Sequence, residues 1–223
     1  MRRPSNPLAL AVLTLLYEKP MHPYEMSSTL RERRKEDSIR VNYGSLYSVV
    51  ESLAKKGLIE AKETVRHGRR PERTIYQLTD AGEVTMTDWL SEILSIPTPQ
   101  FTDFEAALSL IAVLPVDDAR DLLSRRLKEL QFQRTTYDAV RNAAPTAFPR
   151  LFMIEGEYQA ALRDAETEFV RKLIADIDND DLSGLTMWRR MHELRDEDRS
   201  PEDIQKTIAA EFAEELTWQT EPD

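Results

Sequence analysis

The chain has 223 residues, of which 41% are hydrophobic and 31% are charged, and its formal net charge is −10. A chain of this size and apolar content can bury one large core or two small ones. It contains no cysteine and only three histidines. This excludes disulfides, thiolate metal sites and cysteine nucleophiles, and argues against a histidine-rich metal site. Its six glycines favour helices over a turn-rich β fold.

The charge is divided unevenly along the chain. Residues 1–79 contain 15 Lys/Arg and 9 Asp/Glu, a net charge of +6, whereas residues 80–223 contain 15 and 31, a net charge of −16. The total of −10 argues against a nucleic-acid partner. The division instead indicates two parts with different partners, a basic N-terminal part and an acidic remainder.

An apolar run over residues 8–16 follows two arginines and could belong to a signal peptide or to a buried helix. It lacks a small-x-small cleavage site and is much shorter than the ~20 residues that a membrane span needs. Asn6 and Pro7 form a typical helix start, a capping residue followed by proline. We therefore expect a buried first helix, no membrane partner and a cytoplasmic protein.

The N-terminal elements are predicted from apolar spacing and capping residues. We expect helices over 7–18, 22–36 and 43–56, strands over 58–66 and 73–78, and a helix from Thr79 or Asp80 to about Leu94.

Particular residues support these elements. Tyr24, Met26 or Ser27, and Leu30 mark the inner side of the second helix. The apolar positions of the third helix are Leu46, Val49, Val50 and Leu53, with Asn42 as its cap and Gly57 as its C-terminal glycine. Asp80 and Glu83 have the spacing of a capping box for the fourth.

The remainder of the chain is predicted to be helical. Residues 96–99, Ile-Pro-Thr-Pro, form the best candidate boundary. Helices are expected over 102–114, 117–142, 150–177, 185–197 and 201–217. The first would be capped by Thr102 with Glu105, and the second by Asp117.

Three helices followed by a two-stranded hairpin within about 70 residues is the order of a winged helix-turn-helix. The predicted fold is therefore mainly α. We expect a winged helix-turn-helix DNA-binding domain with a two-stranded β wing over 1–95, an α-helical dimerisation domain over 100–177, and additional C-terminal helices over 183–218.

The third helix has an outer face suited to DNA, formed by Ser45, Ser48, Ser52 and Lys55 opposite its apolar positions. Its N-terminus, with Asn42, Tyr43, Gly44 and Tyr47, would face a phosphate. Two alternatives stay open here. Gly44 serves either a close approach to phosphate or a tight first turn, and the tyrosines are either phosphate donors or ordinary half-buried side chains.

The connection between the two strands is strongly basic, with Arg66, His67, Arg69, Arg70 and Arg73. Guanidinium groups at a hairpin tip suit phosphate contact or insertion into the minor groove. A charged run is otherwise often only a solvated loop. Glu51 lies near the DNA-facing side of the third helix, where it would repel phosphate or accept a hydrogen bond from cytosine.

These residues carry a resemblance to a known family. Residues 43–47 (Tyr-Gly-Ser-Leu-Tyr), 53–59 (Leu-Ala-Lys-Lys-Gly-Leu-Ile) and 73–82 (Arg-Thr-Ile-Tyr-Gln-Leu-Thr-Asp-Ala-Gly) resemble the PadR family of bacterial transcriptional regulators, as do residues 22–25 (His-Pro-Tyr-Glu). Proline stands at position 23 where glycine is common. The resemblance covers about residues 8–95 and, more loosely, extends to about 175.

The resemblance implies a dimeric transcription factor, most often a repressor, that binds double-stranded DNA at a palindromic operator. It places this chain with the members whose long C-terminal helices pair two copies. It also implies a small-molecule effector, since some members release DNA when they bind one. The apolar stripes at 101–177 would form the homodimer surface; the alternative is an intrachain bundle. The aromatics Trp89, Phe101, Phe104, Phe152 and Tyr158 either line a ligand cavity or are simply core.

An enzyme and a protein–protein adaptor are the rival functions. No phosphate-binding glycine loop, nucleophile elbow or zinc motif is present, so we expect no enzyme activity and no cofactor. Residues 176–181 begin like a calcium loop but lack its glycine and its final glutamate, which favours a solvated acidic loop. The alternative function is a helical protein–protein adaptor without DNA binding, which would leave the basic hairpin tip unexplained.

Overall fold

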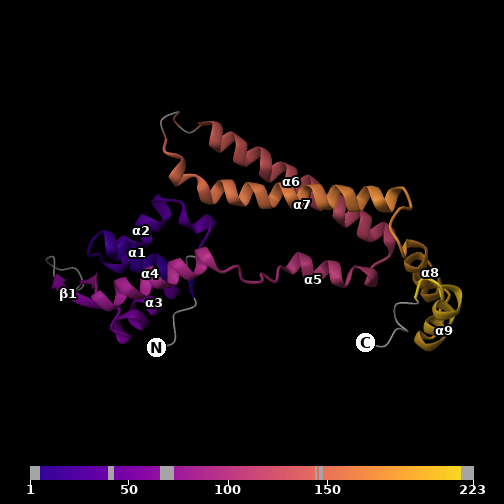
Figure 1. Ribbon diagram of the computed structural model, residues 1–223, viewed down its shortest axis with the longest axis horizontal. Coiled ribbons are helices and arrows are strands. Elements are labelled where there is room, and N and C mark those ends of the chain that lie inside the picture. The colour runs from indigo at the N-terminus through magenta and orange to yellow at the C-terminus, as the bar shows by residue number, and fades with distance from the viewer. Residues whose placement is uncertain (1–5, 40–42, 66–72, 144, 146–147, 217–223) are drawn as a thin grey trace. The chain divides into compact units, whose positions relative to one another are not determined.

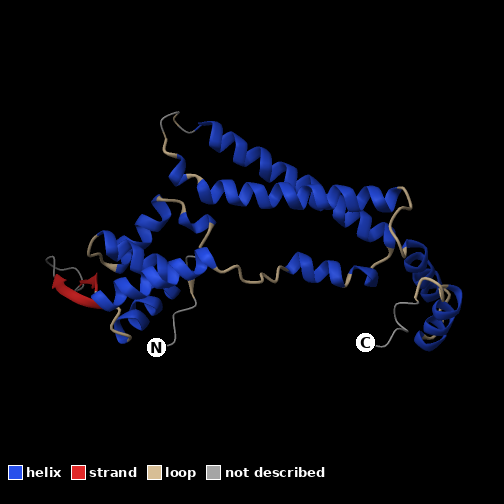
Figure 2. Ribbon diagram, viewed as in Figure 1, coloured by secondary structure: helices blue, strands red, loops and turns tan. Residues whose placement is uncertain are grey.

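The computed structural model describes residues 6–39, 43–65, 73–143, 145 and 148–216 and contains two compact units, Met1–Gln100 and Phe101–Asp223 (Figure 1). Both units are mainly helical, and a single antiparallel pair of strands lies in the first among the described residues (Figure 2). The mainly α fold with a two-stranded hairpin is therefore confirmed.

The N-terminal unit has the predicted order of three helices, a hairpin and a fourth helix. Its elements are α1 (Pro7–Glu18), α2 (Pro23–Glu32), the short 3₁₀ turn η1 (Lys35–Asp37), α3 (Tyr43–Lys55), β1 (Ile59–Val65), β2 (Arg73–Leu78) and α4 (Asp80–Ser95).

Side-chain caps and special residues set the ends of these helices. The Asn6 side chain accepts a hydrogen bond from the Leu8 N–H, and the His22 ring accepts one from the Tyr24 N–H, each at 3.0 Å. Each cap precedes a proline at the first helical position, where a missing N–H costs nothing. Gly57, predicted to end the third helix, has φ +70°, the left-handed conformation that favours glycine.

The hairpin is joined to the helices on one side. β1 and β2 pair antiparallel from Ile59 opposite Leu78 to Val65 opposite Arg73, with an irregularity between Ala61 and Glu63. Met21, in the connection between α1 and α2, exchanges two backbone hydrogen bonds of 3.0 Å with Tyr76 of β2. The outer edge of β2 is thereby paired, which fixes the base of the hairpin on the helical core.

The core of this unit draws on every helix and on β1. Its most deeply buried members include Val12, Leu13, Met26, Leu46 and Leu53. The start of α4 lies so close to residue 58 that a Cβ at Gly82 would stand 2.0 Å from the Leu58 carbonyl oxygen. Glycine is therefore required where the start of α4 passes the segment between α3 and β1.

The C-terminal unit contains helices and no strand among its described residues. It comprises α5 (Asp103–Ser109), the 3₁₀ turn η2 (Ile111–Val113), the long helices α6 (Val116–Ala143) and α7 (Ile154–Asp178) separated by the 3₁₀ turn η3 (Arg150–Phe152), and the shorter helices α8 (Leu185–Asp196) and α9 (Pro201–Glu211).

Helices α6 and α7 lie side by side and antiparallel (Figure 1). A small apolar cluster, including Leu123, Leu130 and Val170, lies between them. Arginines of α6 also form ion pairs with acids of α7, namely Arg120 with Asp178 at 2.9 Å, Arg126 with Glu166 at 2.5 Å and Arg134 with Asp164 at 2.8 Å.

Helix α8 is tied to the turn between α5 and α6. The Trp188 indole N–H donates to the Leu114 carbonyl oxygen at 2.8 Å, and Nε2 of His192 lies 3.0 Å from the Ala112 carbonyl oxygen. Leu185 and Trp188 are buried in the same apolar cluster as α6 and α7. Helix α8 is therefore an integral part of this unit.

Several predicted helix ends were wrong. The second helix stops at Glu32, because Arg34 adopts the left-handed conformation with φ 53°, and a 3₁₀ turn follows. The helix after Thr102 stops at Ser109. Helix α7 begins at 154 rather than 150, and α9 ends at 211 rather than 217.

Two predicted caps and one core position were also wrong. Asp117 lies inside the first turn of α6, because that helix already begins at Val116. Thr79, not Asp80, caps α4 by accepting a hydrogen bond from Gly82 N–H at 3.1 Å. Tyr24 is 61% exposed, because it lies roughly 110° around the helix from the middle of the buried side, which positions 26, 27 and 30 form. The described helices include none that is both long and apolar enough to span a membrane.

Candidate DNA-binding face

Helix α3 has one buried and one exposed side. Leu46, Val50 and Leu53 are at most 1% exposed and belong to the core that also contains α1. The helix therefore packs against the core through this apolar side only. The opposite side carries glycine, hydroxyl and lysine side chains and is open to a partner.

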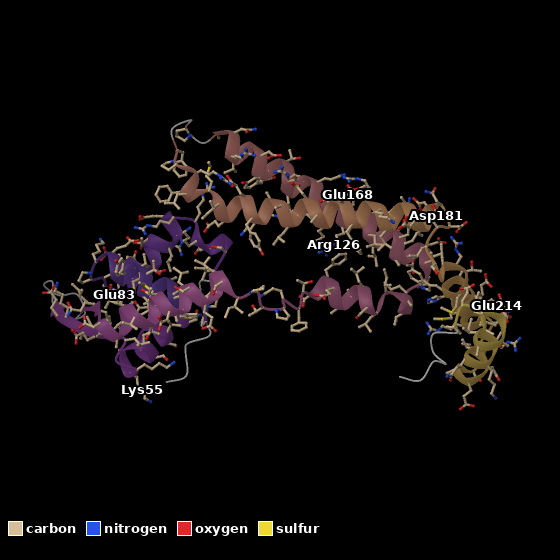
Figure 3. The ribbon with its side chains drawn as sticks, in the orientation of Figure 1. Lys55, Glu83, Arg126, Glu168, Asp181 and Glu214 are labelled. Atoms are coloured by element: carbon tan, nitrogen blue, oxygen red, sulfur yellow. The ribbon has the colours of Figure 1, made fainter. Side chains whose placement is uncertain are left out.

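The structure places five predicted contact residues on this open side. Gly44, Tyr47, Ser48 and Lys55 are exposed, and Ser45 is half-buried. The Ser48 hydroxyl donates to the Gly44 carbonyl oxygen at 3.2 Å, so its oxygen remains able to accept a hydrogen bond. Lys55 projects from the end of the helix (Figure 3). The arrangement offers small polar groups near the start of α3 and a cation at its end.

A groove runs between the outer side of α3 and the start of α1. Its volume is about 470 Å³, and its lining includes Ser45, Ser48 and Ser52 of α3, Lys56 directly after that helix, and Asn6 and Ala9 at the start of α1. Asn6 and Lys56 were not among the predicted contact residues. Asn6 was assigned only a capping role, and the proximity of α1 to this side of α3 depends on tertiary packing.

Helices α1 and α2, which both pack against α3, are joined by an ion pair between α1 and the end of α2. Two nitrogens of the Arg33 guanidinium donate to the two Glu18 carboxylate oxygens at 2.5 and 2.7 Å. These hydrogen bonds lower the pKa of Glu18 below its usual value and raise that of Arg33. The pair is partly exposed, so it adds geometric precision more than free energy.

The remaining predicted contacts lie outside or at the limit of the described residues. Tyr43 is the first residue of α3, but only its backbone is described. Asn42, Arg66, Arg69 and Arg70 lie outside the described residues. The strands that lead to the tip are described, and Gln77 of β2 donates to Glu60 of β1 at 2.7 Å across the hairpin.

The other candidate residues lie in different surroundings. Within the described ranges there is no group of three or more acids and histidines able to hold a metal ion. Of the aromatics considered for a ligand, Trp89 is buried in the core of the first unit, and the Arg126 guanidinium stacks 3.7 Å from the Phe104 ring centre. Phe101 is 91% exposed.

Comparisons with known proteins agree with this geometry. The transcriptional regulator PadR-like family matches residues 12–88. The chain is 27% identical to the negative transcriptional regulator PadR of Bacillus subtilis over 124 residues, which are 56% of this chain and 67% of that protein.

Two crystal structures of Bacillus subtilis PadR share the fold. The complex with operator DNA matches with a TM-score of 0.58 and 21% identity over 78% of this chain and 99% of that chain. The complex with p-coumaric acid matches with a TM-score of 0.61 and 20% identity over 77% and 98%. Residues 12–88 thus match the PadR-like family, and the predicted winged-helix fold is confirmed.

Proposed function

We propose that this chain, which carries a PadR-like transcriptional regulator domain at its N-terminus, binds a palindromic DNA operator as a homodimer and represses transcription there. The observation that carries the proposal is the open side of α3, a polar, glycine- and lysine-containing surface on an otherwise apolar helix. Such a helix in a helix-turn-helix enters the major groove with its N-terminal residues at the base edges.

Each candidate residue receives a role in this proposal. Ser45 and Ser48 contact base edges, and Gly44 permits close approach to the backbone. Asn42, Tyr43, Tyr47 and Lys55 contact phosphates or sugars, as do Arg66, Arg69 and Arg70 at the tip of the wing. The net charge of +6 over residues 1–79 supports this assignment, because phosphate neutralisation supplies much of the affinity for DNA.

The proposed dimer is supported by an exposed apolar row on α7. Tyr158, Leu162 and Phe169 are 66%, 53% and 51% exposed and are separated by four and seven residues, which places them on one side of the helix. Ala165 lies in the same row and is also exposed. A contiguous apolar strip of this kind is typical of an interface, and a second copy would bury it in a symmetric contact.

The division of labour proposed for the chain follows from these surfaces. Residues 1–95 bind DNA, residues 100–177 form the dimer, and residues 183–218 are an addition to this plan. A two-fold dimer would present identical α3 helices to half-sites about one helical turn apart. The Bacillus subtilis protein has been crystallised with p-coumaric acid, which supports a small-molecule effector here. The proposal assigns the chain no catalytic group.

DNA selection followed by salt-dependent titration tests this proposal. Sites bound by the full chain are selected from random DNA, and the dissociation constant for the selected site is measured at several salt concentrations. We expect a palindromic site and a steep linear decrease of log K with log salt concentration. An adaptor without DNA binding would select no sequence and would show no salt-dependent affinity, which would refute the proposal.

A further inference from the structure

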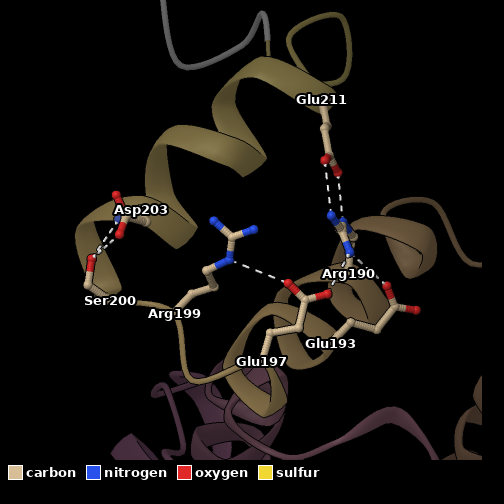
Figure 4. Close-up of polar contacts among 7 residues, drawn as sticks. All are labelled: Arg190, Glu193, Glu197, Arg199, Ser200, Asp203 and Glu211. Carbon is tan, nitrogen blue, oxygen red and sulfur yellow. Dashed lines mark hydrogen bonds and ion pairs between the residues drawn. The ribbon is translucent and has the colours of Figure 1, made fainter.

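Helices α8 and α9 form a hairpin that is held together by polar contacts. Arg190 of α8 donates to Glu211 of α9 at 2.9 Å and to Glu193 at 3.2 Å, and lies 3.8 Å from Glu197 (Figure 4). Ser200 caps α9 by accepting a hydrogen bond from the Asp203 N–H at 3.1 Å. The Arg190–Glu211 ion pair therefore joins the two helices, in addition to their packing.

A groove of about 540 Å³ opens between these two helices. Its apolar lining includes Met187 and Met191 from α8, and Ile204 and Ile208 from α9. The volume lies within the range of roughly 300–1,000 Å³ that is usual for small-molecule sites. Methionine side chains are flexible and polarisable, so they adapt to apolar ligands of different shapes.

The charge of the groove is opposite to that of its surroundings. Residues 183–216 contain five Lys/Arg and nine Asp/Glu, a net charge of −4. The charged residues among the described lining of the groove are Arg195 and Arg199. Two arginines, and no carboxylate among the described residues, therefore line the groove of this acidic helical pair.

Both arginines have donors available for a ligand. Arg195 is exposed and makes no ion pair within the described part of the chain. Arg199 has one long contact, from its Nε to the Glu197 carboxylate at 3.4 Å, and its two terminal nitrogens carry no contact in the close-up (Figure 4). Guanidinium groups pair with carboxylates through parallel hydrogen bonds, which makes these two arginines a suitable carboxylate clamp.

We propose that the α8–α9 groove binds a small amphipathic monocarboxylate, with its apolar body against Met187, Met191, Ile204 and Ile208 and its carboxylate on Arg195 and Arg199. The site lies in the part of the chain beyond the proposed dimerisation helices. Trp188 and His192 of α8 also contact the turn between α5 and α6, so one of the two helices that line the groove is anchored to the rest of the C-terminal unit.

Calorimetric titration of the full chain without DNA tests the proposal. Decanoate, below its micelle concentration, serves as the probe, and decan-1-ol serves as its uncharged analogue. We expect decanoate to bind once per chain, and decanol to bind about tenfold or more weakly because it cannot pair with the guanidinium groups. Equal binding of the two would show a merely apolar groove and would overturn the proposal, as would no binding of decanoate.

Matched variants locate the site. The double variant R195Q/R199Q should weaken decanoate binding about tenfold or more and leave decanol unchanged, whereas R125Q, an exposed arginine on α6, should change neither. A209W, at an exposed residue that lines the groove, should block both probes, whereas A210W, at its exposed neighbour, should block neither.

Two outcomes of these variants contradict the assignment. Unchanged decanoate binding by A209W would place the site elsewhere. If A209W instead lowers the sedimentation mass of the chain and decanoate does not bind the parent protein, a second copy covers the groove and the ligand proposal is wrong. Circular dichroism of each variant confirms that its helices remain folded.

Discussion

Residues 1–100 and residues 101–223 differ in how much of their apolar surface they bury. The first unit has one cluster of 16 buried residues, whereas the main cluster of the second has eight. Among the described residues, the second unit also exposes 14 large hydrophobic side chains, most of them on α6, α7 and the turns beside them. The first unit therefore has a complete core of its own, and the second has a surface suited to another copy.

The ion pairs of the second unit also lie near its surface. Helices α6 and α7 are joined by three arginine–carboxylate pairs, all partly exposed. Exposed pairs contribute little free energy but favour one alignment of two helices. The ion pairs favour one alignment of α6 and α7, and the apolar row of α7 stays exposed. This long helical pair is therefore suited to dimerisation, whereas the N-terminal unit is suited to present α3 to DNA.

The largest expected effect is on the core of the first unit. Leu46→Ala should lower its free energy of unfolding by about 3 kcal/mol, because Leu46 is fully buried and the change leaves a cavity. Phe132→Ala, at a side chain 67% exposed on α6, should cost about 0.5 kcal/mol or less within one chain. Native-state hydrogen exchange measures each unit separately. Equal destabilisation by the two variants would contradict the difference in apolar burial between the two units.

The next effect concerns the proposed dimer. Leu162→Glu introduces a charge in the middle of the apolar row of α7 and should weaken dimerisation about 100-fold while the helices stay folded. Sedimentation equilibrium measures the change. Thr186→Glu, an exposed position on α8, is the control and should leave dimerisation unaltered. A parent chain that is monomeric at micromolar concentration would contradict the proposed interface.

A smaller effect is expected from the tip of the wing. Arg69→Ala with Arg70→Ala should weaken DNA binding, and the salt slope should become shallower by about 0.9 for each phosphate that the protein no longer neutralises. Arg125→Ala with Arg195→Ala, in the acidic C-terminal unit, removes the same charge and should leave the slope in place. A titration in which the two double variants behave alike would argue that only total charge matters.

The smallest effect is expected from the ion pair between Glu18 and Arg33. Because the pKa of Glu18 is lowered by Arg33, the pair stabilises the protein above the usual carboxylate pKa of about 4.5, and this stabilisation is lost as the pH falls through the lowered value. Glu18→Gln should cost about 0.5 kcal/mol at pH 7 and less at low pH, where the carboxyl becomes protonated. Urea unfolding at both pH values measures this, and an equal cost at both would rule out the charged pair as its cause.

Local patterns predicted most of the fold. The Asn6–Pro7 start of α1, the apolar row Leu46, Val50 and Leu53 of α3, and the glycine at position 57 are short-range signals, and each was confirmed. They depend on helix periodicity and capping, which neighbouring residues determine.

The errors arose where distant residues decide the backbone. The helix expected to run through Leu114 ends at Ser109, and the carbonyl oxygens of Ala112 and Leu114 face His192 and Trp188, about 75 to 80 residues away. The contribution of Asn6 to the groove beside α3 likewise depends on the packing of α1. Neither contact leaves a periodic signal in the local sequence.

We propose that the outer side of α3 recognises the DNA sequence. A comparison of selected DNA sites tests this central claim most directly. Sites are selected from random DNA by the parent chain, by Ser45→Ala and Ser48→Ala, and by the control Ser91→Ala at an exposed serine of α4. We predict that the two α3 variants change the preferred bases at symmetric positions and that the control selects the parent site. A uniform loss of affinity across all sequences, or no change at all, would contradict the claim.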